Sequence, residues 1–253
     1  MNKLFFLLSV FITIQAHSQV FNGNQYEVGV DEQLGDTIPL DLKFINESND
    51  TIRLGDLIDR PTIFSFVYFD CPGLCSPLQQ GVSDVIDQSD LILGKDYRSI
   101  TISFNYQDDP VKAGQKKKNF ASCVSKDKCQ HWYYLTSDSA TINTMLRSIG
   151  YHIKISGVDY IHPSGIVVVS PQGKITRYLY GLTFNPFDFK MSIIESQKGL
   201  ARPAISKALD FCFAYEPDGK RYSLQVMKIS ASIIIFLALI FLGVLVFKRK
   251  KSR

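Results

Sequence analysis

Two cysteines lie at the point where an apolar strand is expected to turn into a helix. Residues 62–69 are nearly all β-branched or aromatic, which predicts a buried strand. Cys71 and Cys75 follow it, and residues 78–86 mix polar and apolar side chains as a helix does. Pro72 suits the first position of that helix, where its missing N–H costs no hydrogen bond. We therefore expect both thiols on one face of the helix, because residues four apart are neighbours on its surface.

The expected position at a helix N-terminus has a chemical consequence for these thiols. The positive end of the helix dipole favours the thiolate over the thiol. A pair of thiolates at this spacing can cycle as a disulfide, bind a soft metal ion, or do both.

The rest of the chain alternates strands and helices around this strand. The pattern predicts further strands at 40–45, 51–54, 97–104, 132–135, 164–170 and 174–180, and helices at 109–121, 137–149 and 186–209, the last interrupted near Gly199 and Pro203. This order favours an α/β fold in which helices cover a central mixed sheet. The strand-to-helix thiols and the late hairpin, with a tight turn at Pro171, Gln172 and Gly173, together match a thioredoxin-like fold.

Both ends of the chain carry targeting features. A positive start, an apolar core at 4–14 and small residues at 16 and 18 predict a cleaved signal peptide at 1–18. The alternative is an uncleaved anchor, which usually needs about 20 apolar residues. Residues 229–247 carry no charge and precede a basic tail at 248–253, which predicts one transmembrane helix with a cytoplasmic C-terminus. A domain at 19–210 and a membrane-proximal stalk at 211–228 would then lie on the periplasmic or extracytoplasmic side of the inner membrane.

The charge balance gives no indication of a nucleic-acid partner. Six of the 28 Lys and Arg lie in the predicted signal and tail, while all 24 Asp and Glu lie between these two segments. The exported part is therefore slightly acidic, and its surface is not expected to bind nucleic acid.

Three further cysteines lie apart from Cys71 and Cys75 in the sequence. Cys123 and Cys129 flank a short polar loop, and in an exported chain a local structural disulfide is the favoured interpretation. A second metal site is the alternative, supported only by nearby His131. Cys212 has no evident partner in the sequence, so a buried free thiol and a reactive or intermolecular thiol both remain open.

A third ligand for the cysteine pair can come from His162, which precedes the late hairpin. In a thioredoxin-like layout this loop returns close to the N-terminus of the thiol-bearing helix. Two thiolates with one imidazole suit copper, as Cu(I) or Cu(II), better than Mg²⁺ or Ca²⁺. Zinc also accepts such ligands, although a structural zinc site takes four. The alternative is that His162 only caps its loop through a hydrogen bond, and His131 and His152 are expected at the surface or at strand edges.

Four segments carry a family resemblance. They are residues 69–75 with the Cys-x-x-x-Cys pair, 103–110, 132–136 and 161–175, and they lie within a stretch from about residue 28 to residue 209. On these residues the chain resembles the Sco/SenC family, copper-binding thioredoxin-like proteins of cytochrome c oxidase assembly. Within that family it resembles a bacterial subgroup with a C-terminal membrane anchor. The Cys-x-x-x-Cys pair alone is common, but its combination with a histidine before a strand-turn-strand is specific.

The resemblance implies that Cys71, Cys75 and His162 are copper ligands. It implies a membrane-anchored metallochaperone that delivers copper to the dinuclear copper site of cytochrome c oxidase. The partner would be the copper-bearing subunit of that oxidase or another exported copper protein. A thiol–disulfide oxidoreductase that reduces client cysteines with Cys71 and Cys75 is the alternative. A third possibility is a binding module in which this pair forms a structural disulfide.

Overall fold

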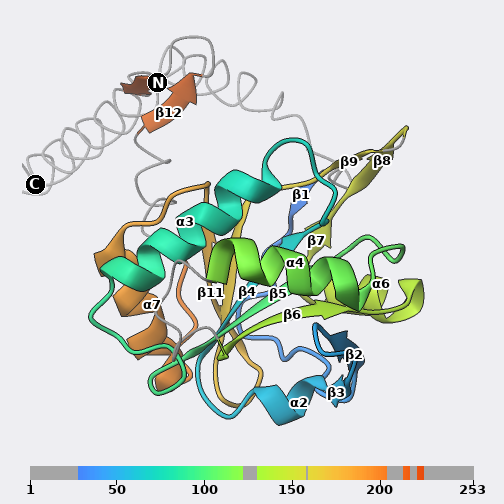
Figure 1. The fold of residues 1–253 in the computed structure, drawn as a ribbon. Helices are drawn as coiled ribbons and strands as arrows, with labels where there is room; N and C mark the ends of the chain where they lie inside the picture. The colour runs from blue at the N-terminus through green and yellow to red at the C-terminus, as the bar shows by residue number, and fades with distance from the viewer. Residues whose placement is uncertain (1–27, 122–129, 158, 204–212, 217–220, 225–253) are drawn as a thin grey trace, which may run out of the picture.

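The computed structural model describes residues 28–121, 130–157, 159–203, 213–216 and 221–224 (Figure 1). The predicted signal peptide, transmembrane segment and basic tail lie outside the described residues, and so do Cys123, Cys129 and Cys212. Within the described ranges, no helix combines the length and the apolar character that crossing a membrane requires.

A mixed sheet of seven strands forms the centre of the fold. Its spatial order is β11-β10-β4-β5-β6-β2-β3, in which β4, β5 and β6 are parallel to one another and the other neighbours pair antiparallel. The strands are β2 (Lys43–Asn46), β3 (Thr51–Arg53), β4 (Thr62–Val67), β5 (Arg98–Ser103), β6 (Trp132–Thr136), β10 (Gly165–Val169) and β11 (Ile175–Tyr180).

Helices cover this sheet, as the α/β prediction requires. They are α2 (Leu54–Leu57), α3 (Cys75–Gln88), α4 (Pro110–Phe120), α6 (Ser139–Ser148) and α7 (Pro186–Gln197). Figure 1 shows α3 and α4 side by side across the sheet, and α3 also contacts α7. The predicted mixed α/β layout is therefore confirmed, and it is the layout of a thioredoxin-like fold.

Local sequence explains where the helices begin. Asp109 caps α4 by accepting a hydrogen bond from the N–H of Lys112, and Pro110 takes the first helical position. Asp138 caps α6 and Asn185 caps α7 in the same way. The helix predicted at 186–209 ends at Gln197, close to the expected interruption, where Gly199 adopts a positive φ of 65°.

The strand β4 is buried along its whole length because the sheet continues on both sides of it and helices cover its faces. Phe64 and Phe66 are fully buried there, as are Ile100 of β5 and Trp132 of β6. At about 25 cal/mol per Å² of apolar area, these side chains supply much of the stabilisation that fixes β4. The loop that carries Cys71 therefore starts from a rigid strand end.

Two expectations about the thiol segment are wrong. The helix α3 begins at Cys75, so Pro72 lies in the preceding turn and not at the first helical position. Cys71 consequently lies outside the helix, and the two thiols do not share a helix face. The N–H of Cys71 instead donates to the carbonyl of Tyr68 in a turn that directly follows β4.

Short ribbons supplement the central sheet. A hairpin of β8 (Lys154–Ser156) and β9 (Asp159–Ile161) projects from the body, and the sequence pattern did not predict it (Figure 1). The strands β1 (Gly29–Val30) and β7 (Tyr151–His152) pair with each other, and so do β12 (Phe213–Glu216) and β13 (Arg221–Leu224). The β8–β9 hairpin matters for the site because His162 follows β9 directly.

Candidate metal centre

Three elements bring Cys71, Cys75 and His162 together. Cys71 lies in the turn after β4, Cys75 is the first residue of α3, and His162 follows β9. One ligand atom of each residue lies within 4.8 Å of the others. The Sγ atom of Cys75 is 3.5 Å from Nε2 of His162. The fold thus assembles the two thiols and the imidazole that the sequence singled out.

Cys71 is the thiol that faces the N-terminus of α3 from outside the helix. Its Sγ accepts hydrogen bonds from the backbone N–H groups of Gly73 and Cys75, each over 3.4 Å. Burial alone would raise the pKa of Cys71, but hydrogen bonds from the Cys75 thiol and from these two N–H groups, together with the nearby Tyr68 hydroxyl, lower it overall. The thiolate that the sequence predicted at a helix N-terminus is therefore favoured at Cys71, although by a different geometry.

The pKa of Cys75 shifts in the opposite direction. Its side chain is only 5% exposed, and this burial raises the pKa of Cys75 well above the ordinary thiol range. The neighbouring Cys71 acts in the same direction, because a second negative charge beside a thiolate is unfavourable. In the metal-free protein the partly exposed Cys71 is therefore the thiol that ionises more readily, and the buried Cys75 is the one that resists ionisation.

His162 presents a defined nitrogen to the thiols. Its Nδ1 lies 2.8 Å from the carbonyl oxygen of Pro163, and a carbonyl can only accept, so Nδ1 carries the proton. The hydroxyl of Tyr151 donates to the same carbonyl. The lone pair of Nε2 consequently points toward Cys75, which is the arrangement that metal-binding histidines use. Burial lowers the pKa of His162, so the neutral imidazole persists below the usual pH of protonation.

Aromatic rings enclose the imidazole. The ring of His162 lies 5.1 Å from that of Phe104 and 6.2 Å from that of Tyr68, measured between centroids. The ring of Tyr160 packs against that of Phe104 at a centroid distance of 5.3 Å and against that of Tyr68 at 5.1 Å. This enclosure leaves His162 only 8% exposed. Cys75 is buried as well, so the partly exposed Cys71 is the most accessible member of the group.

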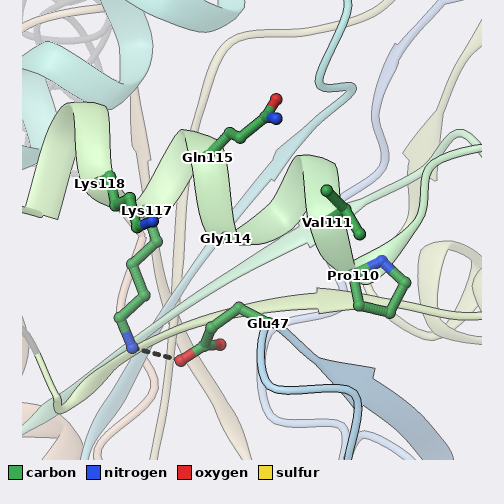
Figure 2. A pocket seen from close by; sticks show the side chains of 7 residues that line it. All are labelled: Glu47, Pro110, Val111, Gly114, Gln115, Lys117 and Lys118. Carbon is green, nitrogen blue, oxygen red and sulfur yellow. Dashed lines mark hydrogen bonds and ion pairs between the residues drawn. The ribbon is translucent and has the colours of Figure 1, made fainter.

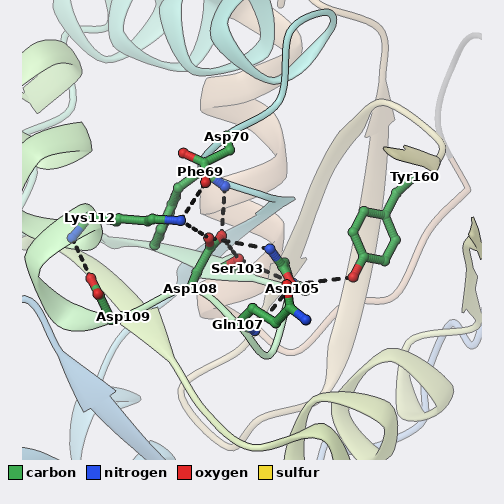
Figure 3. Close-up of polar contacts among 9 residues, drawn as sticks. All are labelled: Phe69, Asp70, Ser103, Asn105, Gln107, Asp108, Asp109, Lys112 and Tyr160. Carbon is green, nitrogen blue, oxygen red and sulfur yellow. Dashed lines mark hydrogen bonds and ion pairs between the residues drawn. The ribbon is translucent and has the colours of Figure 1, made fainter. Parts of the chain in front are cut away.

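A buried carboxylate supports the turn that carries Cys71. Asp108 accepts hydrogen bonds from the N–H of Phe69 at 2.7 Å and from the hydroxyl of Ser103 at 2.6 Å (Figure 3). Lys112 forms ion pairs with both Asp108 and Asp70. The sequence pattern indicated Asp108 only as part of a helix start, because its partner Phe69 lies 39 residues away.

The arrangement has a clear coordination chemistry. Two sulfur donors and one imidazole nitrogen fit a soft or borderline metal ion such as copper. Three protein ligands leave at least one position open, which suits exchange of the ion better than permanent storage.

The other two histidines in the described ranges, His131 and His152, do not add to this group. Within the described ranges, Cys71, Cys75 and His162 are the only cluster of three metal-ligating side chains with this spacing. His131 directly precedes β6 and is partly buried, and His152 lies in the short strand β7, so both lie at strands, in line with the expected strand-edge positions. The proposed pairing of Cys123 with Cys129 stays a prediction.

A separate surface hollow lies along α4. Its lining includes Val111, Gly114 and Glu47, and Glu47 pairs with Lys117 (Figure 2). That carboxylate is already paired with a lysine, and the described residues that line the hollow include no cysteine or histidine, so they do not form a metal site.

Comparisons with known proteins place this geometry in context. No protein-family model matches the sequence, and no curated protein sequence matches it either. Solved structures do match. A protein of Aquifex aeolicus VF5 described as a candidate electron transfer protein has a TM-score of 0.60 and 25% identity, over 65% of this chain and 95% of that one.

Two Sco proteins match at lower identity. Copper-bound ScoI of Arabidopsis thaliana has a TM-score of 0.52 and 17% identity, over 65% of this chain and 98% of its own. BsSco, described as a member of the Sco family of cytochrome c oxidase assembly proteins, has a TM-score of 0.52 and 22% identity, over 68% of this chain and 96% of its own. The chain therefore has the fold of the Sco proteins and carries within it a Cys-Cys-His group that fits a copper site.

Proposed function

We propose that this chain is a copper-binding protein of the Sco/SenC family that delivers its ion to the dinuclear copper site of cytochrome c oxidase. The observation that carries the proposal is the convergence of Cys71, Cys75 and His162, whose ligand atoms lie within 4.8 Å of one another. The shared fold adds support, because one structural neighbour is a copper-bound ScoI and another is described as an oxidase assembly protein.

The donor set favours copper over the alternatives. Thiolates are soft ligands that select copper over Mg²⁺ and Ca²⁺. A structural zinc site would need a fourth protein ligand, and none completes this group in the part of the chain that is described. Copper is the cargo in this proposal, and the protein supplies a low-coordinate holder for it.

The accessibility of the ligands suggests how the ion leaves. Cys75 and His162 are buried, whereas Cys71 is partly exposed. An acceptor thiolate would therefore approach beside Cys71 and replace it as a ligand first. The ion then passes between proteins through shared ligands and is never free in solution.

The proposal includes the topology that the sequence predicts. A cleaved signal at 1–18 and a single span at 229–247 would hold the domain at the periplasmic face of the inner membrane, with residues 248–253 in the cytoplasm. This location brings the metal centre to the membrane in which a respiratory oxidase resides.

Copper stoichiometry and a thiol count on the full chain test the proposal. Wild-type protein should bind one copper, and His162→Ala should bind it more weakly while both thiols of the pair remain titratable. His152→Ala is the matched control, because His152 lies in β7 and outside the cluster, and it should bind copper like the wild type. A wild type without copper, or equal affinity in wild type and His162→Ala, would overturn the proposal.

The asymmetry of the two thiols favours a second function, thiol–disulfide exchange. The Cys71 thiolate would attack a client disulfide to form a mixed disulfide and release one client thiolate. Cys75, on losing its proton, would attack the Cys71 sulfur, so that the client leaves as a dithiol and a Cys71–Cys75 disulfide remains. Two electrons pass to the client, and a cellular dithiol must restore the pair. Reduction of a protein disulfide by wild type but not by Cys71→Ser would establish this activity, and equal rates would exclude it.

A further inference from the structure

Two tyrosine hydroxyls connect the His162-bearing hairpin to the body of the protein. The hydroxyl of Tyr68, at the end of β4, donates to the carboxylate of Asp159 in β9 over 3.1 Å. The hydroxyl of Tyr160, also in β9, donates in the opposite direction to Oδ1 of Asn105 over 3.2 Å (Figure 3). We call these two hydrogen bonds the hairpin latch.

The hairpin lies apart from the central sheet. The strands β8 and β9 pair only with each other and not with the central sheet. Their residues are exposed except for Tyr160, which is partly buried against Phe104 and Tyr68. A two-stranded ribbon of this size is marginally stable by itself in water. The latch and the packing of the Tyr160 ring on Tyr68 and Phe104 therefore help to fix its position.

The latch acts close to the metal centre. Asp159 and Tyr160 precede His162 by three and two residues, so the latch fixes the chain that enters the ligand. The two latch residues outside the hairpin, Tyr68 and Asn105, also lie close to the site. Tyr68 lies three residues before Cys71, and Asn105 contacts Asp108, which holds the N–H of Phe69.

We propose that the hairpin latch, formed by Tyr68 with Asp159 and by Tyr160 with Asn105, preassembles the site by holding His162 against the two thiols. The four residues are positioning residues, and none of them ligates the ion. This inference rests on the proposed copper function and adds a means of regulation. Release of the latch frees His162 from the site while Cys75 stays fixed in α3.

Three single substitutions separate the latch from other effects. Tyr160→Phe and Asp159→Ala each remove one latch hydrogen bond without touching Cys71. Tyr68→Phe removes a latch bond as well, but it also removes a hydroxyl that interacts with Cys71. Tyr97→Phe is the matched control, because the Tyr97 hydroxyl is buried in the core and has no hydrogen-bond partner among the described residues.

Copper affinity of the full chain is the first readout. Tyr160→Phe and Asp159→Ala should each weaken copper binding about 5-fold, the factor expected for one net hydrogen bond. In a His162→Ala background the same two substitutions should have no effect on affinity, because the latch acts through His162. Tyr97→Phe should match the wild type in both backgrounds.

Amide hydrogen exchange of the metal-free protein is the second readout. Residues 159–162 should exchange faster in Tyr160→Phe and Asp159→Ala than in wild type, while residues of β4 should not change. Unchanged exchange at 159–162, unchanged copper affinity, or an equal loss of affinity in the His162→Ala background would each overturn the latch. If the wild type binds no copper, the proposed function fails and the exchange comparison still decides whether the latch exists.

Discussion

The backbone N–H of Cys75 donates a hydrogen bond to the Sγ atom of Cys71 over 3.4 Å. The sulfur of Cys71 therefore accepts a hydrogen bond from the first N–H of α3, and Cys75 is the first residue of that helix. The two cysteines of the motif are chemically unequal although only three residues separate them.

This inequality predicts selective alkylation. In the reduced, metal-free chain, iodoacetamide should modify Cys71 before Cys75 at pH 7. The lowered pKa of Cys71 makes its thiolate the more accessible form of the two, and the raised pKa of Cys75 keeps that residue as the thiol. As the pH falls through the lowered pKa, the rate at Cys71 should drop as the thiolate becomes protonated. Peptide mapping by mass spectrometry reads both sites, and equal rates at the two cysteines at pH 7 would contradict the prediction.

A second prediction concerns the carboxylate beneath the Cys71 turn. Asp108→Ala should lower the free energy of unfolding by about 3 kcal/mol, because it leaves the buried N–H of Phe69 without its acceptor and removes a charged hydrogen bond. Asp109→Ala is the control, since it removes only an exposed helix cap, and it should cost about 1 kcal/mol. Urea denaturation measures both. A smaller loss for Asp108→Ala than for Asp109→Ala would show that Asp108 does not support the turn.

Much of the fold could be predicted from the sequence because its strongest signals are local. The strand at 62–69 and the helices at 109–121 and 137–149 all appear with shifts of about two residues at their ends. His162 was predictable as a neighbour of the thiols because the strand-turn-strand after it fixes where the chain returns.

One error arose from a competing local turn, and the other from contacts between residues far apart in the sequence. Pro72 favours a helix start, but the turn closed by Tyr68 and Cys71 delays the helix to Cys75. The strands β8 and β9 have only three residues each, and the hairpin is packed through Tyr160 on the rings of Tyr68 and Phe104, which directly follow β4 and β5. Such contacts join residues more than 50 positions apart, which periodicity cannot register.

A third prediction uses two glycines on either side of Cys75. A Cβ at Gly81 would lie 1.8 Å from the carbonyl oxygen of Leu182, so Gly81→Ala forces α3 away from that backbone. We expect a loss of about 3 kcal/mol, at the upper end of the usual cost of overpacking. Gly73→Ala is the matched control. A Cβ at Gly73 meets nothing within 4 Å, so this variant should unfold in urea like the wild type. Equal midpoints for the two variants would show that α3 can shift freely.

The last prediction concerns the buried polar network one turn below Cys75. Gln79, which is 2% exposed, donates to the hydroxyl of Ser65 over 3.0 Å, and its amide oxygen accepts from Thr101 and Tyr134. These bonds fasten α3 to three adjacent strands of the sheet. Gln79→Leu and Thr101→Val should each lower the free energy of unfolding by about 2 kcal/mol, because each leaves buried polar partners unsatisfied.

The double variant tests whether these residues act as one network. Gln79→Leu with Thr101→Val should cost clearly less than the two single losses combined, since the second substitution removes a partner that the first has already orphaned. Gln79→Leu combined with Asn143→Ala, an exposed change in α6, should be additive within about 0.5 kcal/mol. Strict additivity for the Gln79 and Thr101 pair would show that the two residues stabilise the helix bearing Cys75 independently and do not act as one network.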